Sequence, residues 1–350
     1  MQFTILGKEY DISEKKITIS HYLLQYLPIE ICNLINLEIL NLSNNLLSNI
    51  PVEIKQLINL KILNLSLNKF NYFPNNVCNL INLQTLYISS NEISILPKEI
   101  SNLINLKKLY LTNNQISNID NILNLINLEY LNLSYNKLKS LPNDISKLIN
   151  LETLNLENNQ LKIIQIDLCN LINLKKIYLA NNQISNIENL LNLTNLEYLN
   201  LSYNKLKSVP NDICKLIKLE KLYISNNKIK HLPIKFCELI NLQTLDITNN
   251  ILSNLPNQIN NLINLEYLYL QNNFLCKLPN NILKIKDILF LNETSYDINN
   301  MDIQNEIIIF NQLNNKINNL PINTKQIWLK KNNIFQYDIK IPFGCEILYF

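Results

Sequence analysis

A single spacing dominates this 350-residue sequence. The pattern Leu-x-x-Leu-x-Leu-x-x-Asn-x-Leu recurs in steps of 23 residues, two of which are shortened to 22. Its eleven copies begin at Leu37, Leu60, Leu83, Leu106, Leu128, Leu151, Leu174, Leu196, Leu219, Leu242 and Leu265. A fixed period of about 20 to 50 residues is typical of repeat architectures, in which each unit contacts only its neighbours. We therefore expect the repeats to stack and to share one continuous core.

Each repeat predicts one strand and one crossover. The Leu-x-Leu alternation places Leu40 and Leu42 on a buried face and Asn41 on the opposite face. The leucines of the next repeat, Leu63 and Leu65, are expected about 4.8 Å away on a neighbouring parallel strand. Parallel strands need a crossover, which the Leu-Pro-x-x-Ile-x-x-Leu segment supplies. Nine of the 11 prolines occupy one position of this segment, where a fixed φ and a missing N–H suit a turn outside the sheet.

A column of asparagines follows the predicted strands. The chain must bend there, which leaves backbone N–H and C=O groups unpaired in the interior. A buried amide side chain can both donate and accept hydrogen bonds, so stacked asparagines can satisfy these groups. We therefore predict a structural ladder, rather than a ligand site, formed by Asn45, Asn68, Asn91, Asn114, Asn136, Asn159, Asn182, Asn204, Asn227, Asn250 and Asn273.

The repeat frame resembles the leucine-rich repeat family. Its 23-residue Leu-Pro form is similar to the intracellular, Ras-associated class, whereas the two 22-residue copies lack the proline and resemble the bacterial internalin-like class. The resemblance covers residues 37–287. It implies an α/β fold, a leucine-rich repeat solenoid or horseshoe with a concave parallel β-sheet and short helices or loops on the convex side. It also implies a protein partner and no catalysis.

Both ends of the chain depart from the frame. Residues 1–36 are predicted to form an N-terminal cap, in which a hairpin around Gly7 precedes a degenerate repeat. The eleven clear repeats occupy 37–287. Residues 288–350 retain only short degenerate copies, and we expect them to form an irregular C-terminal cap.

The composition excludes several classes of function. There are only 2 glycines, so no glycine-rich phosphate loop is present. All 31 basic residues are lysines, balanced by 28 acidic residues, which argues against a nucleic-acid partner. His21 and His231 lie about nine repeats apart, too far to share a metal. No stretch approaches ~18 apolar residues. We therefore expect no cofactor, no metal and no membrane span.

The cysteines indicate a reducing compartment. Five of the 7 occupy the same position of the repeat, which indicates a shared structural role rather than a disulfide framework: Cys32, Cys78, Cys169, Cys214 and Cys237. Asn-x-Ser sequons also recur on the predicted strands, where a secreted chain would risk glycosylation. We expect free thiols and an intracellular protein, located in the cytoplasm.

Tyrosines gather at the outward strand positions. Tyrosine offers a large contact area with few rotatable bonds and is enriched in interfaces. Lysines lie beside these tyrosines and would steer a charged partner. The predicted partner-binding residues are Tyr87, Tyr110, Tyr130, Tyr178, Tyr198, Tyr223, Tyr267, Tyr269, Lys108 and Lys176. The alternative interpretation is that tyrosine merely suits an exposed strand.

Two other functions remain open besides a non-catalytic scaffold that binds a protein partner. A structural or assembly component would self-associate through its convex and edge surfaces, and the oligomeric state is left open. An enzyme would need interacting titratable groups. Glu129 and Glu152 are neighbours in one predicted column, as are Glu197 and Glu220, but lysines flank each pair. That pattern favours a solvated row of charges over a catalytic site.

Overall fold

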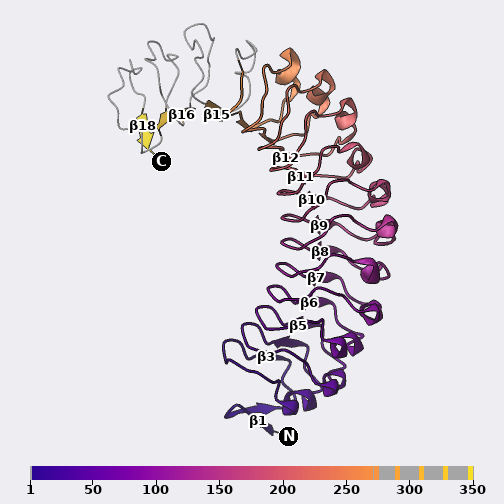
Figure 1. The fold of residues 1–350 in the computed structure, drawn as a ribbon. Helices are drawn as coiled ribbons and strands as arrows, with labels where there is room; N and C mark the ends of the chain where they lie inside the picture. Colours follow the sequence, from indigo (N-terminus) through magenta and orange to yellow (C-terminus); the bar gives the residue numbers. More distant parts are fainter. Residues whose placement is uncertain are drawn as a thin grey trace. The chain divides into compact units, whose positions relative to one another are not determined.

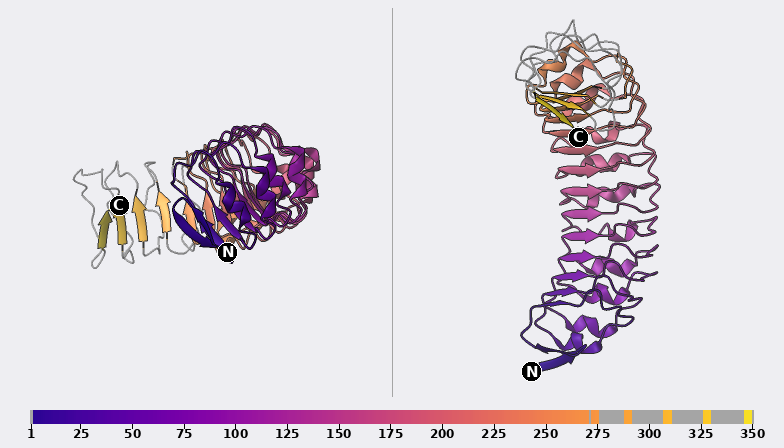
Figure 2. Two further views of the ribbon diagram at one scale, coloured as in Figure 1. Left: turned by 90° about the horizontal axis from the view of Figure 1, so that it is seen from below. Right: turned by 90° about the vertical axis from the view of Figure 1, so that its left-hand side faces the viewer.

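The computed structural model describes residues 2–270, residues 272–275 and four later strands. The chain divides into two compact units, residues 1–178 and 179–350. In each unit, parallel strands lie side by side along one face, and short 3₁₀ helices lie on the opposite side (Figure 1). The two further views in Figure 2 show the strands of the first unit stacked in one direction. This arrangement is the predicted leucine-rich repeat solenoid.

The first unit begins with a hairpin and continues as a parallel sheet. Strands β1 (Gln2–Ile5) and β2 (Lys8–Asp11) pair in antiparallel fashion around Gly7, whose φ of 76° suits a glycine. The parallel strands are β3 (Lys16–Thr18), β4 (Ile39–Asn41), β5 (Ile62–Asn64), β6 (Thr85–Tyr87), β7 (Lys108–Tyr110), β8 (Tyr130–Asn132), β9 (Thr153–Asn155) and β10 (Lys176–Tyr178). Residues 1–36 thus contain a hairpin and the first parallel strand.

The second unit repeats the same plan. Its first strands are β11 (Tyr198–Asn200), β12 (Lys221–Tyr223), β13 (Thr244–Asp246) and β14 (Tyr267–Tyr269). Four further parallel strands follow in register: β15 (Ile288–Leu291), β16 (Ile307–Phe310), β17 (Gln326–Leu329) and β18 (Glu346–Tyr349). The predicted C-terminal cap therefore contains regular strands, and the segments that connect them lie outside the described residues.

The crossovers are 3₁₀ helices wherever the structure describes them. Those of the first unit are η1 (Ile29–Asn33), η2 (Val52–Gln56), η3 (Asn75–Asn79), η4 (Lys98–Asn102), η5 (Asp120–Ile122), η6 (Asn143–Lys147) and η7 (Ile166–Asn170). Those of the second are η8 (Glu188–Leu190), η9 (Asn211–Lys215), η10 (Ile234–Glu238) and η11 (Asn257–Asn261). Helices η5 and η8 belong to the two 22-residue repeats. There Ile119 and Ile187 replace the proline that precedes most of the others.

The leucine pattern creates the core. Leu40 and Leu63 are direct register partners on β4 and β5, and both are fully buried. Leu42 and Leu65, two residues further on, are buried as well, whereas Asn41 is half-buried on the outer face. One repeat cannot enclose its own leucines, so the stacking of repeats supplies the burial that stabilises each of them.

A left-handed residue reverses the chain after each regular strand. In the first unit these residues have φ between 54° and 58°: Asn44, Leu67, Ser90, Asn113, Tyr135 and Asn158. Asparagine adopts this conformation more readily than other non-glycine residues, which accounts for its frequency here. The reversal directs the next side chain into the interior, where the predicted asparagine column lies.

Candidate functional site

The buried asparagine column bonds the backbone of two repeats. Asn68 donates from Nδ2 to the carbonyl of Leu65 in its own repeat and to that of Leu42 in the preceding repeat, both at 3.0 Å. Its Oδ1 accepts the backbone N–H of Leu47, also at 3.0 Å. Asn91, Asn114, Asn136 and Asn159 make the corresponding bonds within the first unit. Every donor and acceptor on this side chain thus serves the fold.

The same arrangement recurs in the second unit. Asn204, Asn227 and Asn250 each bond three carbonyls and one backbone N–H, at 2.9 to 3.2 Å. Asn273 donates to Ile247 and Leu270. Asn182 donates to the carbonyl of Leu179 at 3.1 Å. These amides are occupied by the backbone and are not offered to a ligand.

A second asparagine ladder, which we did not predict, lies at the exposed edge. In eight Leu-Ile-Asn-Leu segments the asparagine Nδ2 donates to the carbonyl of the isoleucine one repeat earlier, at 2.7 to 2.9 Å. The donors are Asn59, Asn82, Asn105, Asn127, Asn150, Asn173, Asn241 and Asn264. The recurrence of Ile-Asn-Leu at the repeat period was the available signal in the sequence.

On strands β4 to β14, the outward position that ends the strand holds either asparagine or tyrosine, with one aspartate. Where it is asparagine, the side chain caps the strand: Asn64 Oδ1 accepts the backbone N–H of Ser66 at 2.9 Å. Asn41, Asn132, Asn155 and Asn200 make the same bond to the residue two positions on. A phenol cannot bend back to accept this bond. The tyrosines at this position therefore do not form the strand-capping hydrogen bond.

Three predicted tyrosines come together in the first unit. Tyr87 and Tyr110 are register partners on β6 and β7, and their ring centroids are 4.4 Å apart at an interplanar angle of 18°. Tyr130 on β8 joins them, with its centroid 4.7 Å from that of Tyr110. The three rings form a continuous aromatic cluster, half-buried on the sheet face.

Burial within this cluster changes the acidity of its central member. Burial, with a smaller contribution from Tyr87 and Tyr130, raises the pKa of Tyr110 to about 12. Its phenol therefore stays protonated to a higher pH than that of an ordinary tyrosine.

Lysines surround the aromatic cluster on the sheet face. Lys108 is exposed and is the register partner of Tyr130. Lys107 and Glu129 form an ion pair of 2.9 Å in the neighbouring column, and Lys175 and Glu152 form one of 3.0 Å. Of the two carboxylate pairs noticed in the sequence, Glu129 and Glu152 are thus neutralised by lysines, as expected for a solvated row of charges.

The other predicted residues of the first unit lie apart from this cluster. Lys176 and Tyr178 are on β10, where Lys176 is the register partner of Thr153 and Tyr178 of Asn155. Strand β9 carries no tyrosine, so it separates Tyr178 from Tyr130. The tyrosine columns are therefore interrupted within this unit.

The second unit has its own group of predicted tyrosines. Tyr198 and Tyr223, on β11 and β12, have ring centroids 5.4 Å apart at 37°. Tyr267 and Tyr269 both lie on β14, two strands beyond Tyr223. Asp246 on β13 lies between Tyr223 and Tyr269 in register. We did not single out this aspartate from the sequence. The signal was an acidic residue in a column otherwise occupied by asparagine and tyrosine.

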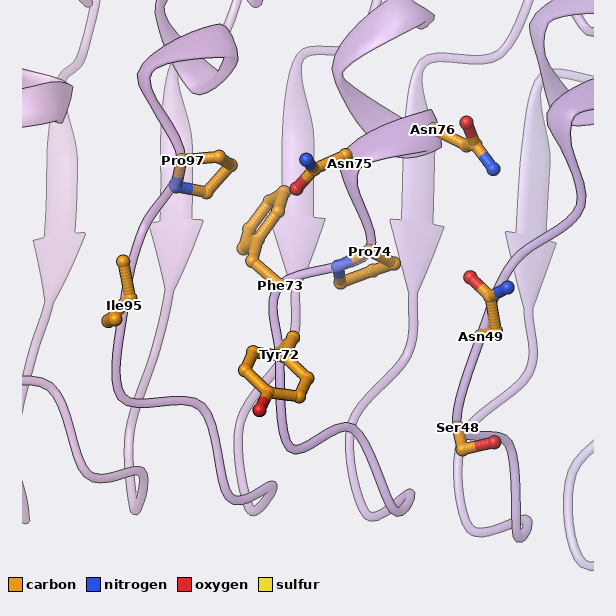
Figure 3. A pocket seen from close by; sticks show the side chains of 9 residues that line it. All are labelled: Ser48, Asn49, Tyr72, Phe73, Pro74, Asn75, Asn76, Ile95 and Pro97. Atoms are coloured by element: carbon orange, nitrogen blue, oxygen red, sulfur yellow. The ribbon is translucent and has the colours of Figure 1, made fainter.

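A pocket of about 620 Å³ lies among the loops that precede η2, η3 and η4 in the first unit (Figure 3). Its lining includes Tyr72, Phe73, Asn76 and Ile95. The amide of Asn76 is bonded to the carbonyl of Ile50 at 2.7 Å. The lining contains no carboxylate, histidine, lysine or cysteine.

Within the described part of the chain, no three His, Cys, Asp or Glu side chains are grouped so that they could hold a metal ion. Nor does any helix in that part have the length and apolar character needed to cross a membrane.

The cysteines that share one position of the repeat are buried or half-buried. Among the described cysteines, Cys32, Cys78 and Cys237 are buried and Cys169 and Cys214 are half-buried, and all five are free thiols. Burial raises the pKa of Cys32 and Cys78 to about 12 and that of Cys237 to about 11. Cys276 and Cys345 lie outside the described residues.

We expect alkylation by iodoacetamide at pH 8.5 to distinguish these positions. The thiolate is the reactive form, so a raised pKa and burial both slow the reaction at Cys32, Cys78 and Cys237. Cys169 should react first in the native protein, while all seven thiols should react after unfolding without a reductant. Peptide mapping by mass spectrometry measures both. Any cysteine that resists alkylation after unfolding would reveal a disulfide and weaken the assignment to a reducing compartment.

Comparisons with known proteins agree with this geometry. A family model for a leucine-rich repeat region matches residues 177–328, and further leucine-rich repeat models match 36–57, 81–124, 104–161 and 149–193. Among curated proteins, none shows significant similarity to the chain.

Solved structures supply the similarity. A leucine-rich repeat protein of Leptospira interrogans is 34% identical, with a TM-score of 0.71, over 78% of this chain and 77% of that one. An internalin of Listeria monocytogenes is 25% identical, with a TM-score of 0.62, over 77% and 85%. An octameric complex of latrophilin 3, Unc5D and FLRT2, in which FLRT2 contributes leucine-rich repeats, matches at 26% identity and a TM-score of 0.64, over 74% and 82%. The chain belongs to the leucine-rich repeat family.

Proposed function

We propose that this protein is a non-catalytic scaffold that binds a protein partner on the tyrosine-bearing face of its sheet, the face predicted from the sequence to be concave. Leucine-rich repeat proteins are typically interaction scaffolds without enzymatic activity, which supports the general class. The choice of face depends on one observation. Where asparagine would cap the strand, five positions instead hold tyrosine: Tyr87, Tyr110, Tyr178, Tyr223 and Tyr269.

Energetics favour a functional reason for these tyrosines. A strand-end asparagine contributes a local hydrogen bond, as Asn64 does to Ser66 at 2.9 Å. Tyrosine provides no such bond and leaves part of an aromatic ring exposed to water. Aromatic residues that cluster on an exposed face are typical anchors of protein interfaces, where a few central side chains supply most of the binding energy.

The proposal includes the location of the protein in the cell. We place the protein inside the cell, in a reducing compartment, because the five described cysteines are free thiols and three of them are buried. Its partner would then be another intracellular protein.

The variant with Tyr110→Ala and Tyr130→Ala tests the proposed face. Removal of two stacked rings should weaken partner binding by roughly 30-fold or more, since loss of a central anchor costs about 2 kcal/mol or more. Both side chains point away from the leucine core, so the thermal melting temperature should change little. The measurement is quantitative affinity capture from extracts of the source organism, followed by titration of each captured protein against purified variants.

A variant on the opposite side of the first unit provides the control. Asn143→Ala with Asp144→Ala removes two exposed side chains of η6. Proteins that this control retains and the tyrosine variant loses are the expected partners. If binding is lost in the control and kept in the tyrosine variant, the proposed face is wrong.

A second function, self-association, is favoured by a separate observation. One position of the repeat holds an exposed isoleucine, 44% to 63% exposed in the first unit and 50% to 72% in the second. The residues are Ile35, Ile58, Ile81, Ile104, Ile126, Ile149 and Ile172 in the first unit and Ile217, Ile240 and Ile263 in the second. Exposed apolar side chains that recur in this way within a unit are typical of interaction sites. The same capture experiment separates the two functions, because recovery of this chain itself as the captured protein would support assembly.

A further inference from the structure

Two tyrosines flank one carboxylate on three consecutive strands of the second unit. Tyr223 on β12 is the register partner of Asp246 on β13, which is in turn the register partner of Tyr269 on β14. The leucines before them, Leu222, Leu245 and Leu268, are buried. Because side chains alternate along a strand, the Tyr–Asp–Tyr row projects from the opposite, outer face.

The negative charge of Asp246 is not required by the fold. Its Oδ1 accepts the backbone N–H of Thr248 at 3.0 Å and the Thr248 hydroxyl at 2.8 Å. Asn200 caps its own strand through the same backbone bond, to Ser202, also at 3.0 Å. The neutral amide of Asn200 therefore caps its strand in the same way as the carboxylate of Asp246 does. The negative charge of Asp246 is additional to this structural role.

The spacing of the two tyrosines suits one cation between them. Two strand separations place the Tyr223 and Tyr269 columns about 9.5 Å apart, with Asp246 midway. A cation seated above Asp246 would lie about 5 Å from either column, within the ~6 Å over which an aromatic face attracts a positive charge. On its far side Tyr223 contacts the Tyr198 ring at 5.4 Å, which restrains its orientation.

The electrostatic surroundings also favour a cation. Burial, together with the charge of Asp246, raises the pKa of Tyr223, and burial with nearby Tyr223, Tyr267 and Asp246 raises that of Tyr269. Asp246 forms no ion pair with any described residue, although Lys221 lies on the same face. Its negative charge is therefore available to an external partner.

The charge of the whole face is consistent with this. We compared three positions of each strand: its first residue, its third residue and the residue that precedes it. On strands β11 to β14 the charged side chains at these positions are Glu197, Glu220, Glu266, Asp246 and Lys221. The same positions on β3 to β10 hold seven lysines and three glutamates: Lys15, Lys16, Lys61, Lys107, Lys108, Lys175, Lys176, Glu38, Glu129 and Glu152. The acidic face of the second unit therefore complements a basic partner.

We propose that Tyr223, Asp246 and Tyr269 form a binding site for one arginine or lysine side chain from a basic segment of a protein partner. The cation would stack between the two phenol rings and donate a hydrogen bond to the carboxylate. A metal ion is a poorer occupant, because the row offers a single carboxylate. The site predicts that the partner presents a basic side chain. This inference rests on the proposed function only in assigning that side chain to a protein.

The experiment uses short peptides as probes of the full-length chain. The probe is acetyl-Gly-Arg-Gly-amide, its lysine counterpart is a second probe, and the citrulline peptide is the neutral control of nearly the same shape. NMR of ring-labelled tyrosines follows the titration, with resonances assigned through single Tyr→Phe variants. We expect saturable shifts at Tyr223 and Tyr269, little change at Tyr87, and at least fivefold weaker binding of the citrulline peptide.

Matched variants separate a cation site from general attraction. Asp246→Asn keeps the strand cap and should weaken arginine-peptide binding by about tenfold. Tyr269→Leu should weaken it severalfold, whereas Tyr269→Phe, which retains the aromatic face, should preserve it. Asn155→Asp places a carboxylate at the equivalent position of the first unit, beside only one tyrosine, and should create no such site.

Three results would overturn the proposal: equal binding of the arginine and citrulline peptides, unchanged binding by Asp246→Asn, or equal shifts of all tyrosines. These results are independent of partner capture. If the peptides bind as expected while no captured protein depends on the tyrosine face, the proposed function fails and the cation site stands. If capture depends on that face but Asp246→Asn binds both the peptide and the partner like the unmodified protein, the cation site fails alone.

Discussion

Asn159→Ala should lower the free energy of unfolding by about 1 to 3 kcal/mol, because the buried N–H of Leu138 loses its hydrogen-bond partner and such a loss costs about that much. The Asn159 Nδ2 donates to the carbonyls of Leu133 at 2.9 Å and Leu156 at 3.1 Å, and its Oδ1 accepts the N–H of Leu138 at 3.0 Å. Water has little access here, because Asn159 is 8% exposed. Alanine leaves the Leu138 N–H without its partner and removes one of the two amides that donate to the Leu133 carbonyl, the other being that of Asn136 at 3.1 Å.

The exposed ladder offers the matched control. Asn150 donates one bond, to the carbonyl of Ile126 at 2.9 Å, and the residue is exposed, so water can replace the amide. Asn150→Ala should therefore cost below about 1 kcal/mol. Urea unfolding of both variants, followed by circular dichroism, measures the difference. Equal losses at the two positions would contradict the view that burial decides the importance of these asparagines.

The sequence predicts most of the fold because its constraints are local and repeated. A one-residue error in register would turn Leu40 outward and Asn41 inward, so the leucine pattern alone determines which face is buried. The positions of the buried asparagines follow for the same reason, since the chain must bend at one point of every repeat. The parallel strands, their faces and their crossovers could all be read from that pattern.

The surface was less predictable because its contacts join different repeats. Asn59 looks like an ordinary exposed polar residue in the sequence, yet its amide bonds the carbonyl of Ile35 in the preceding repeat. The column of outward residues was correct, but the pattern could not show that Tyr87 and Tyr110 stack at 4.4 Å. Ring orientation depends on side-chain rotamers and neighbours, which a repeat period does not specify.

The charges illustrate the same limit. The alternation of lysine and glutamate beside the strands predicted cancellation, and Lys107 and Glu129 do pair at 2.9 Å. Near Asp246, however, Lys221 forms no ion pair with any residue in the part of the chain that the structure describes. Counting charges along a column gives their balance, but whether two side chains meet depends on geometry that only the structure provides.

Leu154→Ala is the second large effect that we expect. Leu154 is fully buried on β9, and its register partners are Leu131 on β8 and Ile177 on β10. Truncation of a buried leucine costs about 2 to 5 kcal/mol, because the transfer of apolar surface is lost and a cavity remains. Thr153→Ala, one residue earlier on the outer face of the same strand, should cost less than about 1 kcal/mol and serves as the control.

The distribution of the damage distinguishes a repeat protein from a globular one. Each repeat contacts only its neighbours, so the cavity at Leu154 should loosen β8, β9 and β10 first and leave β4 protected. Amide hydrogen exchange with mass spectrometry resolves this, because peptides from each repeat report their own opening. Faster exchange confined to the central strands supports nearest-neighbour stability. A uniform increase from Ile39 to Tyr178 would mean that the first unit unfolds as one cooperative body.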